Sequence, residues 1–182
     1  MRIVAGRYKN RRIELPKDPA FQAIRPTSDF ARQAIFNLLT SRTTLEGAQV
    51  LDLCAGSGAL GLEALSRGAS SVLFVDQSTA ALAHIEGHLA RFGAEGGQTL
   101  HTDVRRLPPT ATPVDLLFFD PPYRCGWLTE VLASLQPLGY IHPNSWIVIE
   151  YEHGESISLP PTIARQEQRR YGRAVIELLR SV

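Results

Sequence analysis

The stretch DLCAGSGALG at residues 52–61 places Gly56, Gly58 and Gly61 in the spacing Gly-x-Gly-x-x-Gly. It follows an apolar run that ends at residue 54 and precedes a segment of helical periodicity, so it predicts a tight turn from a strand into a helix. Such a turn commonly binds a nucleoside-containing ligand at the start of the helix. Taken alone, the spacing also fits an NAD-binding loop, or a turn that needs glycine only for its positive φ.

Outward from this stretch, short apolar runs alternate with segments of helical periodicity over most of the chain. This alternation predicts an α/β fold with a mostly parallel sheet and helices on both faces. After Gly154 two strands joined at Gly172 predict a hairpin, which puts an antiparallel strand at the edge of the sheet. The predicted strands are 48–54, 70–76, 98–103, 114–120, 145–151, 162–171 and 174–180, and the predicted helices are 59–67, 78–92, 103–107 and 126–136.

The composition indicates a cytoplasmic protein. With 182 residues, 44% of them hydrophobic and 20% charged, the chain has the size and composition of one main globular domain. No apolar run approaches the roughly 20 residues of a membrane span, and the start MRIVAGRYKN lacks the features of a secretory leader. The two cysteines, Cys54 and Cys125, have the spacing of neither a disulfide framework nor a zinc site, so we expect no bound metal.

The net charge of +1 conceals an uneven distribution along the chain. Residues 1–32 are basic, residues 33–164 are acidic, and the remainder is basic again. Residues 1–16 alternate well enough to predict a small basic hairpin, and a helix is expected to begin near Ser28, a good N-cap residue. A basic end of this kind is either a nucleic-acid-binding surface or only a solubilising face.

Three aspartates lie at the ends of predicted parallel strands: Asp52, Asp76 and Asp103. Ligands of such sheets bind at the carboxyl ends of the strands, so we expect these side chains in one site. Asp52 would repel a dinucleotide pyrophosphate but attract the ammonium group of a methionine moiety, and Asp103 is positioned to accept from an adenine amino group. Together with the terminal hairpin, the aspartates favour S-adenosylmethionine (SAM) over a dinucleotide.

A second motif, Asp120-Pro121-Pro122-Tyr123, follows the apolar run at 114–119. The prolines fix φ near −65° and remove two N–H donors, so the loop presents acceptors without competing donors. The Asp120 carboxylate and the Pro121 carbonyl can accept both hydrogens of an exocyclic amino group and direct its lone pair at a methyl donor. Tyr123 supplies a face on which an extruded base can stack.

Several stretches in one order resemble the RsmD family, the 16S rRNA (guanine(966)-N(2))-methyltransferases. They are RIVAGRYKNRR (2–12), RPTSDFARQAIFNLL (25–39), DLCAGSGALGLEALSRGA (52–69), FVDQS (74–78) and FFDPPY (118–123). The resemblance implies a class I methyltransferase domain at 28–182 and a small β extension at 1–27. It also implies SAM as cofactor and, as substrate, the N2 amino group of a guanine in 16S rRNA within the small ribosomal subunit or its assembly intermediate.

We expect three groups of site residues, and the resemblance matches some of them by position, namely Asp52, Gly56, Gly58, Asp76, Asp103 and Asp120 to Tyr123. Those of the catalytic loop are Asp120, Pro121, Pro122 and Tyr123. Those that bind the cofactor are Asp52, Cys54, Ala55, Gly56, Ser57, Gly58, Asp76, Gln77, Asp103 and Val104. Those that bind RNA are Arg7, Lys9, Arg11, Arg12, Arg25 and Thr27. The chain departs from the family at Asn10, where glycine is usual, at Gln33, where glutamate is usual, and at Cys54, where an aromatic residue is common.

Other interpretations remain open. The segment HIEGH (84–88) spaces two histidines like metal ligands, but the order is not that of a zinc protease, and we expect a solvated helix face. Cys125 could be the nucleophile of a C5-pyrimidine methyltransferase, although no Pro-Cys signature supports it. The loop would also serve an N6-adenine methyltransferase acting on DNA or RNA, and a catalytically silent protein that binds RNA or ribosomal subunits is a further alternative. We expect a monomer.

Overall fold

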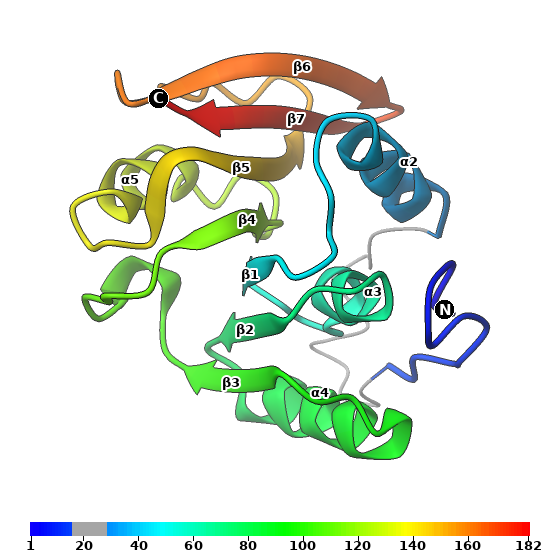
Figure 1. Cartoon of the computed structure of the whole chain (residues 1–182). Helices are drawn as coiled ribbons and strands as arrows, with labels where there is room; N and C mark the ends of the chain where they lie inside the picture. Colours follow the sequence, from blue (N-terminus) through cyan, green and yellow to red (C-terminus); the bar gives the residue numbers. More distant parts are fainter. Residues whose placement is uncertain (16–28) are drawn as a thin grey trace.

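The computed structural model describes residues 1–15 and 29–182, and a sheet in the order β3-β2-β1-β4-β5-β7-β6 forms its centre (Figure 1). Neighbouring strands run parallel except at β7, which is antiparallel to both β5 and β6. The strands are β1 (Gln49–Leu53), β2 (Ser71–Asp76), β3 (Gly97–His101), β4 (Val114–Phe119), β5 (Ile141–Glu152), β6 (Ile163–Tyr171) and β7 (Ala174–Ser181). The described helices are α2 (Asp29–Thr40), α3 (Ala59–Ser66), α4 (Thr79–Phe92) and α5 (Leu128–Leu135), with a short 3-10 helix η1 (Val104–Arg106).

This architecture confirms the predicted α/β fold, including the mostly parallel sheet and the terminal hairpin. One detail of the prediction was wrong, because the antiparallel strand is not at the edge. β7 is buried along most of its length and pairs with the buried strand β5, whereas the polar strand β6 is outermost. The register of β6 shifts at a bulge between Arg165 and Glu167.

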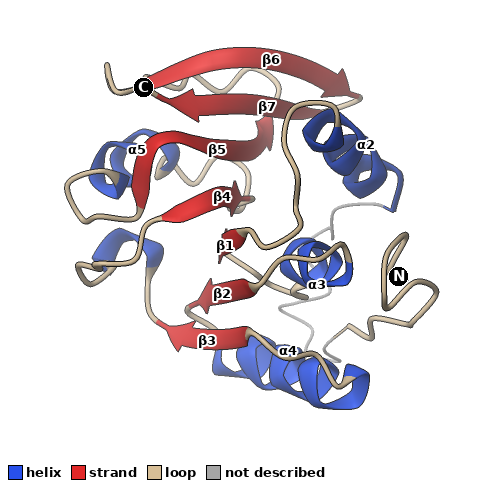
Figure 2. Ribbon diagram, in the orientation of Figure 1, coloured by secondary structure: helices blue, strands red, loops and turns tan. Residues whose placement is uncertain are grey.

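Helices lie on both faces of the sheet (Figure 2), and each face has its own apolar core. Helices α2, α3 and α4 cover one face and pack on strand residues such as Phe74 and Phe118. Helix α5 and η1 cover the other face, where they meet Phe119 and Ile149. Because side chains alternate between the faces of a strand, Phe118 and its neighbour Phe119 belong to different cores. The predicted helices on both faces are therefore confirmed.

Residues 1–15, which we call the N-terminal segment, fold back on themselves against α3. An isolated antiparallel bridge pairs Arg2 with Arg12, and the N–H of Ile3 donates to the carbonyl of Arg11 at 3.0 Å. The predicted basic hairpin is thus present in abbreviated form, as a bridge with a turn between its arms. The helix expected near Ser28 is α2, which begins at Asp29, and Ser28 itself lies outside the described residues.

The buried carboxylate of Glu63 anchors the N-terminal segment to α3. Its two oxygens accept from the backbone N–H groups of Val4 at 2.8 Å and Ala5 at 3.0 Å. On the other side it meets the guanidinium groups of Arg67 at 2.9 Å and Arg32 at 3.8 Å. Since Glu63 has no exposed surface, its charge depends entirely on these partners.

Ser66 provides a second anchor at the end of the same helix. Its hydroxyl oxygen accepts from the N–H of Tyr8 at 2.9 Å, and its carbonyl accepts from the N–H of Arg7 at 2.7 Å. Gly6 is required there, because a Cβ on it would lie 1.7 Å from the Ser66 carbonyl oxygen. All eight residues of α3 are buried, so the helix lies between the sheet and the N-terminal segment.

The boundary predicted between 1–27 and 28–182 lies outside the described residues, and this division stays a prediction. The apolar side chains of the N-terminal segment, Ile3, Tyr8 and Ile13, belong to the same core as α3. Within 1–15 and 29–182, no helix is long and apolar enough to cross a membrane.

Replacing Glu63 by alanine is expected to destabilise the protein by about 3–5 kcal/mol, because it leaves buried guanidinium and N–H groups without their acceptor. Urea unfolding of Glu63→Ala and wild type would measure the loss. The matched control is Glu95→Ala, at an exposed glutamate beyond the end of α4, which should change stability by less than about 0.5 kcal/mol. Equal midpoints for both variants would contradict the anchoring role of Glu63.

Candidate functional site

The glycine loop runs from the end of β1 to the start of α3 through left-handed backbone. Cys54, Gly56 and Gly58 have φ values of 57°, 53° and 72°. At Gly58 a Cβ would also lie 2.7 Å from the Ile85 side chain of α4, so the loop packs tightly on its neighbours. The predicted strand-to-helix turn is confirmed, and it lies at the carboxyl end of β1.

The N–H groups of the three loop glycines all donate to acceptors within the protein. Gly56 donates to Asp76 Oδ2 at 2.8 Å, and Gly61 donates to Asp52 Oδ2 at 2.9 Å. Gly58 donates to the carbonyl of Ala55 at 2.7 Å. In dinucleotide-binding loops, such amides bind a pyrophosphate. Here all three N–H groups already donate to acceptors within the protein. The loop geometry therefore favours a ligand without a pyrophosphate.

The carboxyl ends of β1, β2 and β4 bring acidic groups together. Asp52 is 2% exposed, and burial raises its pKa well above the usual value, with the neighbouring charges of Asp120 and Asp76 acting in the same direction. Asp76 also accepts from the N–H of Ser78 at 2.8 Å, and each of its carboxylate oxygens retains a further lone pair. This negative environment repels phosphate groups and suits a positively charged ligand.

The cofactor-binding residues predicted after the third strand lie at η1. Asp103 was expected to end the third strand, but β3 ends at His101 and Asp103 instead caps η1. Its carboxylate accepts from the backbone N–H of Arg105 at 2.9 Å. The guanidinium of Arg105, and to a smaller extent its backbone N–H, lower the pKa of Asp103 to about 2. The Arg105 guanidinium lies 4.7 Å from the ring centre of Trp127, ahead of α5.

The remaining predicted cofactor residues differ in exposure. Gln77 is exposed and its carbonyl lies 3.0 Å from His101 Nε2. Val104 is buried, as is Ala55, whose N–H donates to Val75 at 3.0 Å. The half-buried Ser57 directs its hydroxyl at the sulfur of Met1, 3.9 Å away, so the N-terminal segment reaches the glycine loop.

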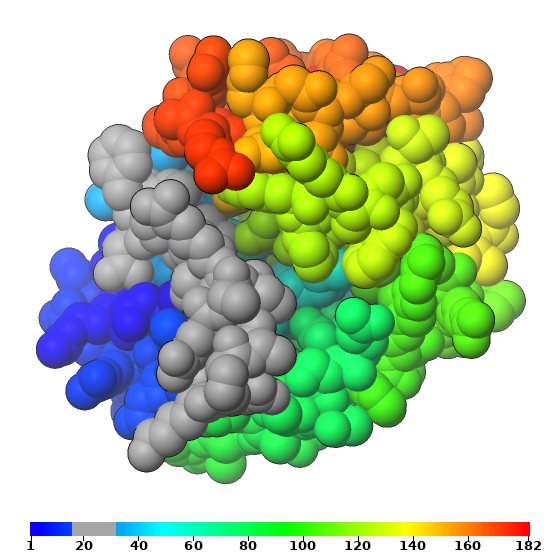
Figure 3. All heavy atoms as spheres, turned by 180° about the vertical axis from the view of Figure 1, so that it is seen from behind, coloured from blue at the N-terminus to red at the C-terminus, as the bar shows by residue number. Residues whose placement is uncertain are grey.

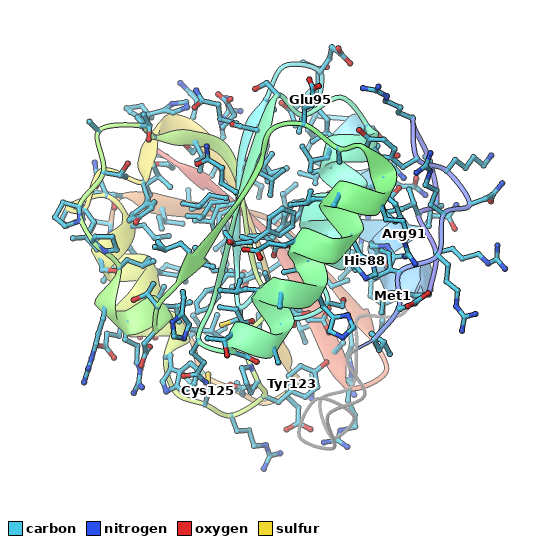
Figure 4. All side chains as sticks on the ribbon, turned by 90° about the horizontal axis from the view of Figure 1, so that it is seen from below. Met1, His88, Arg91, Glu95, Tyr123 and Cys125 are labelled. Atoms are coloured by element: carbon cyan, nitrogen blue, oxygen red, sulfur yellow. The ribbon has the colours of Figure 1, made fainter. Side chains whose placement is uncertain are left out.

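The Asp120-Pro121-Pro122-Tyr123 loop, which we call the Asp-Pro-Pro-Tyr loop, lies beside the glycine loop. Phe119, the last residue of β4, pairs with Leu53, the last residue of β1, so the two loops leave the sheet side by side. Asp120 is half-buried, Pro121 is buried and Pro122 is exposed. The Tyr123 side chain is 38% exposed and lies with Cys125 at the same end of the molecule (Figure 4).

Acidic residues at the end of β5 hold this loop in place. The hydroxyl of Tyr123 donates to Glu150 Oε1 at 2.9 Å. Arg124, which has a φ of 57°, donates its N–H to Glu155 at 3.0 Å and pairs through its side chain with Glu152. These glutamates were not among the predicted site residues. Charged residues within the apolar run 145–151 and just after it were the feature of the sequence that indicated them.

The two thiols near the site are not activated. Burial raises the pKa of Cys54 far above its usual value, and the carboxylates of Asp76 and Asp120 raise it further. Burial likewise raises the pKa of Cys125. Because the thiolate is the nucleophile, these environments disfavour the covalent mechanism considered for Cys125.

The predicted RNA-binding residues that the structure describes gather on the N-terminal segment. Arg7, Lys9, Arg11 and Arg12 are all exposed. Arg11 is also tied to α4, because its guanidinium donates to the carbonyl of Arg91 at 2.9 Å. Figure 3 shows the N-terminal segment and the chain that follows β4 on one face of the molecule. The other two predicted residues, Arg25 and Thr27, lie outside the described residues.

The HIEGH segment is not the solvated helix face that we expected. His88 is 3% exposed, and its Nε2 lies 3.1 Å from the carbonyl of Glu14, while Nδ1 lies 3.0 Å from Arg91 (Figure 4). Burial lowers the pKa of His88. The reason is the N-terminal segment, which covers this part of α4. Among the described residues, no group of three or more His, Cys, Asp or Glu side chains is placed to hold a metal ion.

Comparison with known proteins agrees with this geometry. A family model described as "Conserved hypothetical protein 95" matches residues 1–180. "Ribosomal RNA small subunit methyltransferase D" of Escherichia coli (strain K12) is 34% identical over 153 residues, which cover 84% of this chain and 75% of the relative. The YlbH protein of Bacillus subtilis (strain 168) is 32% identical over 168 residues, with 90% and 88% covered.

Solved structures show the same fold. The structure of the Escherichia coli protein yhhF superimposes with a TM-score of 0.86 at 30% identity, and the match covers 100% of this chain and 97% of that one. The match thus includes the sheet, the glycine loop and the Asp-Pro-Pro-Tyr loop together. The chain therefore belongs to the family described as Conserved hypothetical protein 95, the RsmD family.

Proposed function

We propose that this protein transfers a methyl group from SAM to the exocyclic N2 amino group of a guanine in 16S rRNA, guanine 966 by family resemblance. The observation that carries the proposal is the pairing of Leu53 with Phe119, which sets the glycine loop and the Asp-Pro-Pro-Tyr loop side by side. A cofactor loop and an acceptor loop are the two parts that methyl transfer to an amino group requires. Membership of the RsmD family supports the choice of small-subunit rRNA as substrate.

The donor set fits SAM. The sulfonium and ammonium groups of SAM are cationic, which matches the acidic surroundings of Asp52, Asp76 and Asp120. Asp76 retains lone pairs for ribose hydroxyls, and Gln77 and Val104 would line the nucleoside together with Asp103. When bound, SAM supplies an electrophilic methyl group.

The Asp-Pro-Pro-Tyr loop prepares the acceptor nitrogen. The lone pair of an amino group on a purine ring is delocalised, so the nitrogen is a weak nucleophile until its hydrogens are held. The Asp120 carboxylate and the Pro121 carbonyl accept those two hydrogens and direct the lone pair out of the ring plane. Asp120 then takes up the proton that the nitrogen loses on methylation. Tyr123, partly exposed, provides the stacking face for the extruded base.

The RNA backbone is held by the N-terminal segment. This segment carries exposed basic side chains. It lies on the same face as the chain that follows β4 (Figure 3), so phosphates flanking the target nucleotide can be bound while the base enters the site. The substrate is the small subunit or an assembly intermediate of it, and the protein acts in the cytoplasm as a monomer, without a metal ion.

Nucleoside analysis by mass spectrometry tests the proposed reaction. Small subunits from cells that lack this protein, incubated with enzyme and labelled SAM, are expected to contain labelled N2-methylguanosine. Asp120→Ala should lower the rate at least about 100-fold while SAM binding is retained. Labelled N6-methyladenine, in RNA or in duplex DNA tested in parallel, would overturn the guanine assignment. An effect on subunit assembly that survives Asp120→Ala, with no label, would favour the binding-protein alternative.

The phosphate-binding role predicts a change in salt dependence. Replacing Lys9 and Arg12 together by alanine should weaken RNA binding and reduce the slope of log K against log salt by about 2, because two cationic contacts are lost. Affinity for SAM should not change. The control Arg169→Ala, on the polar strand β6, should leave the slope as it is. An unchanged slope in the double variant would refute the role of the N-terminal segment.

The buried charge of Asp52 predicts a conflict between stability and cofactor binding. Its raised pKa means that this residue favours the folded state while protonated and opposes it as the pH rises and the carboxylate ionises. Asp52→Asn keeps an acceptor for Gly61 but removes the charge. The variant should therefore be more stable than wild type by a margin that grows as the pH rises from about 4 to neutrality, and it should bind SAM more weakly.

Urea unfolding at several pH values and calorimetric titration with SAM would measure the two effects. The control is Glu95→Gln, at an exposed glutamate, which should change neither. A variant less stable than wild type at neutral pH would show that the ionised carboxylate of Asp52 stabilises the free protein.

A further inference from the structure

Glu150, on β5, has one carboxylate oxygen without a hydrogen-bond donor. The residue is 7% exposed, and its Oε1 accepts from the hydroxyl of Tyr123 at 2.9 Å. Its Oε2 is buried, and the described part of the chain supplies it with no partner. Buried carboxylate oxygens are normally paired, because leaving one without a donor is unfavourable. A donor for this oxygen has to come from outside the described residues, and a bound molecule can supply one.

Glu150 lies beside the acceptor loop. Phe119, the last residue of β4, pairs in parallel register with Ile149 of β5, and Asp120 and Glu150 are the residues that come next, so the two acids leave neighbouring positions of the sheet. Within β5, Glu150 follows Val148 by two positions, and Val148 packs in the core on the α3 side, so alternation directs Glu150 to that side. Burial raises the pKa of Tyr123, and the charges of Glu150 and Asp120 raise it further, so both carboxylates lie near its hydroxyl.

We propose that Glu150 is a specificity-determining residue, whose unpaired oxygen accepts the ring N1–H of the target guanine while Asp120 holds the N2 amino group. The inference rests on the proposed function and deepens it. The same carboxylate already accepts a hydrogen bond from Tyr123, the residue on which the base would stack.

The chemistry of purine edges supports this assignment. Guanine carries two donors side by side on its Watson–Crick edge, N1–H and the N2 amino group, so two neighbouring carboxylates complement it. Adenine carries an amino group next to an unprotonated N1, so a carboxylate at Glu150 would face a lone pair instead of a hydrogen. The Asp-Pro-Pro-Tyr loop binds an exocyclic amino group of either base, whereas Glu150 would admit guanine and reject adenine.

The burial of Glu150 strengthens the discrimination. Water cannot readily reach a buried acceptor to donate a hydrogen bond in place of the substrate. A base without N1–H therefore leaves this carboxylate oxygen unpaired, which is unfavourable. Burial raises the pKa of Glu150, and the hydrogen bond from Tyr123 acts in the opposite direction, toward the ionised form that can accept.

A base analogue separates the two contacts. 2-Aminopurine keeps the N2 amino group but has an unprotonated N1, so only the proposed contact with Glu150 is lost. Small subunits are reconstituted with either guanine or 2-aminopurine at the target nucleotide. The kcat/KM of wild type should be at least about tenfold higher for guanine than for 2-aminopurine. Glu150→Gln still has an oxygen for Tyr123 but presents an N–H to N1, so it should reduce this preference at least about tenfold or reverse it.

Glu152→Gln is the matched control, because it makes the same change two residues along β5, where the carboxylate binds Arg124 and Arg173 rather than the base. It should alter both rates without changing their ratio. The proposal is overturned if Glu150→Gln lowers both rates equally. It is also overturned if wild type methylates both bases equally well, a result that requires no variant. If wild type methylates no guanine at all, the proposed function itself fails before the ratio is measured.

Discussion

The hydrogen bond from Gly61 to the buried carboxylate of Asp52 fixes helix α3 against the end of β1, and much of the molecule depends on that position. The glycine loop that precedes α3 takes its shape between this contact and the one from Gly56 to Asp76. On the other side of the helix, Glu63 and Ser66 hold the N-terminal segment. A single helix of eight residues therefore couples the proposed cofactor site to the proposed RNA-binding surface.

Negative charge accumulates where the parallel strands end. Asp52 and Asp76 lie at the ends of β1 and β2, Asp120 follows β4, and Glu150 extends the series onto β5. Burying carboxylates together opposes folding, since each raises the free energy of ionising the next. A fold that retains such an arrangement is adapted to ligands that bring positive charge or hydrogen-bond donors. In this interpretation the cation belongs to the cofactor and the donors belong to the base.

Much of this organisation was readable from the sequence. Apolar runs and glycine spacing located the strands and the glycine loop to within a few residues, because local periodicity determines them. The edge position predicted for the antiparallel strand was wrong, since the order of the two hairpin strands depends on burial in the assembled sheet. The burial of His88 and the anchoring by Glu63 went unforeseen for the same reason: both depend on the N-terminal segment, which is distant in sequence. Glu150 was detectable only as a charge inside an apolar strand.

The outermost strand, β6, has a consequence for the whole molecule. An edge strand exposes a row of backbone donors and acceptors on which a strand from another molecule can pair. β6 carries charged residues along this edge, among them Arg165, Glu167 and Arg169, and it is interrupted by a bulge. Flat hydrophobic edges aggregate, whereas charged and irregular ones resist it. The charged and irregular edge of β6 therefore disfavours extension of the sheet by a strand from another molecule.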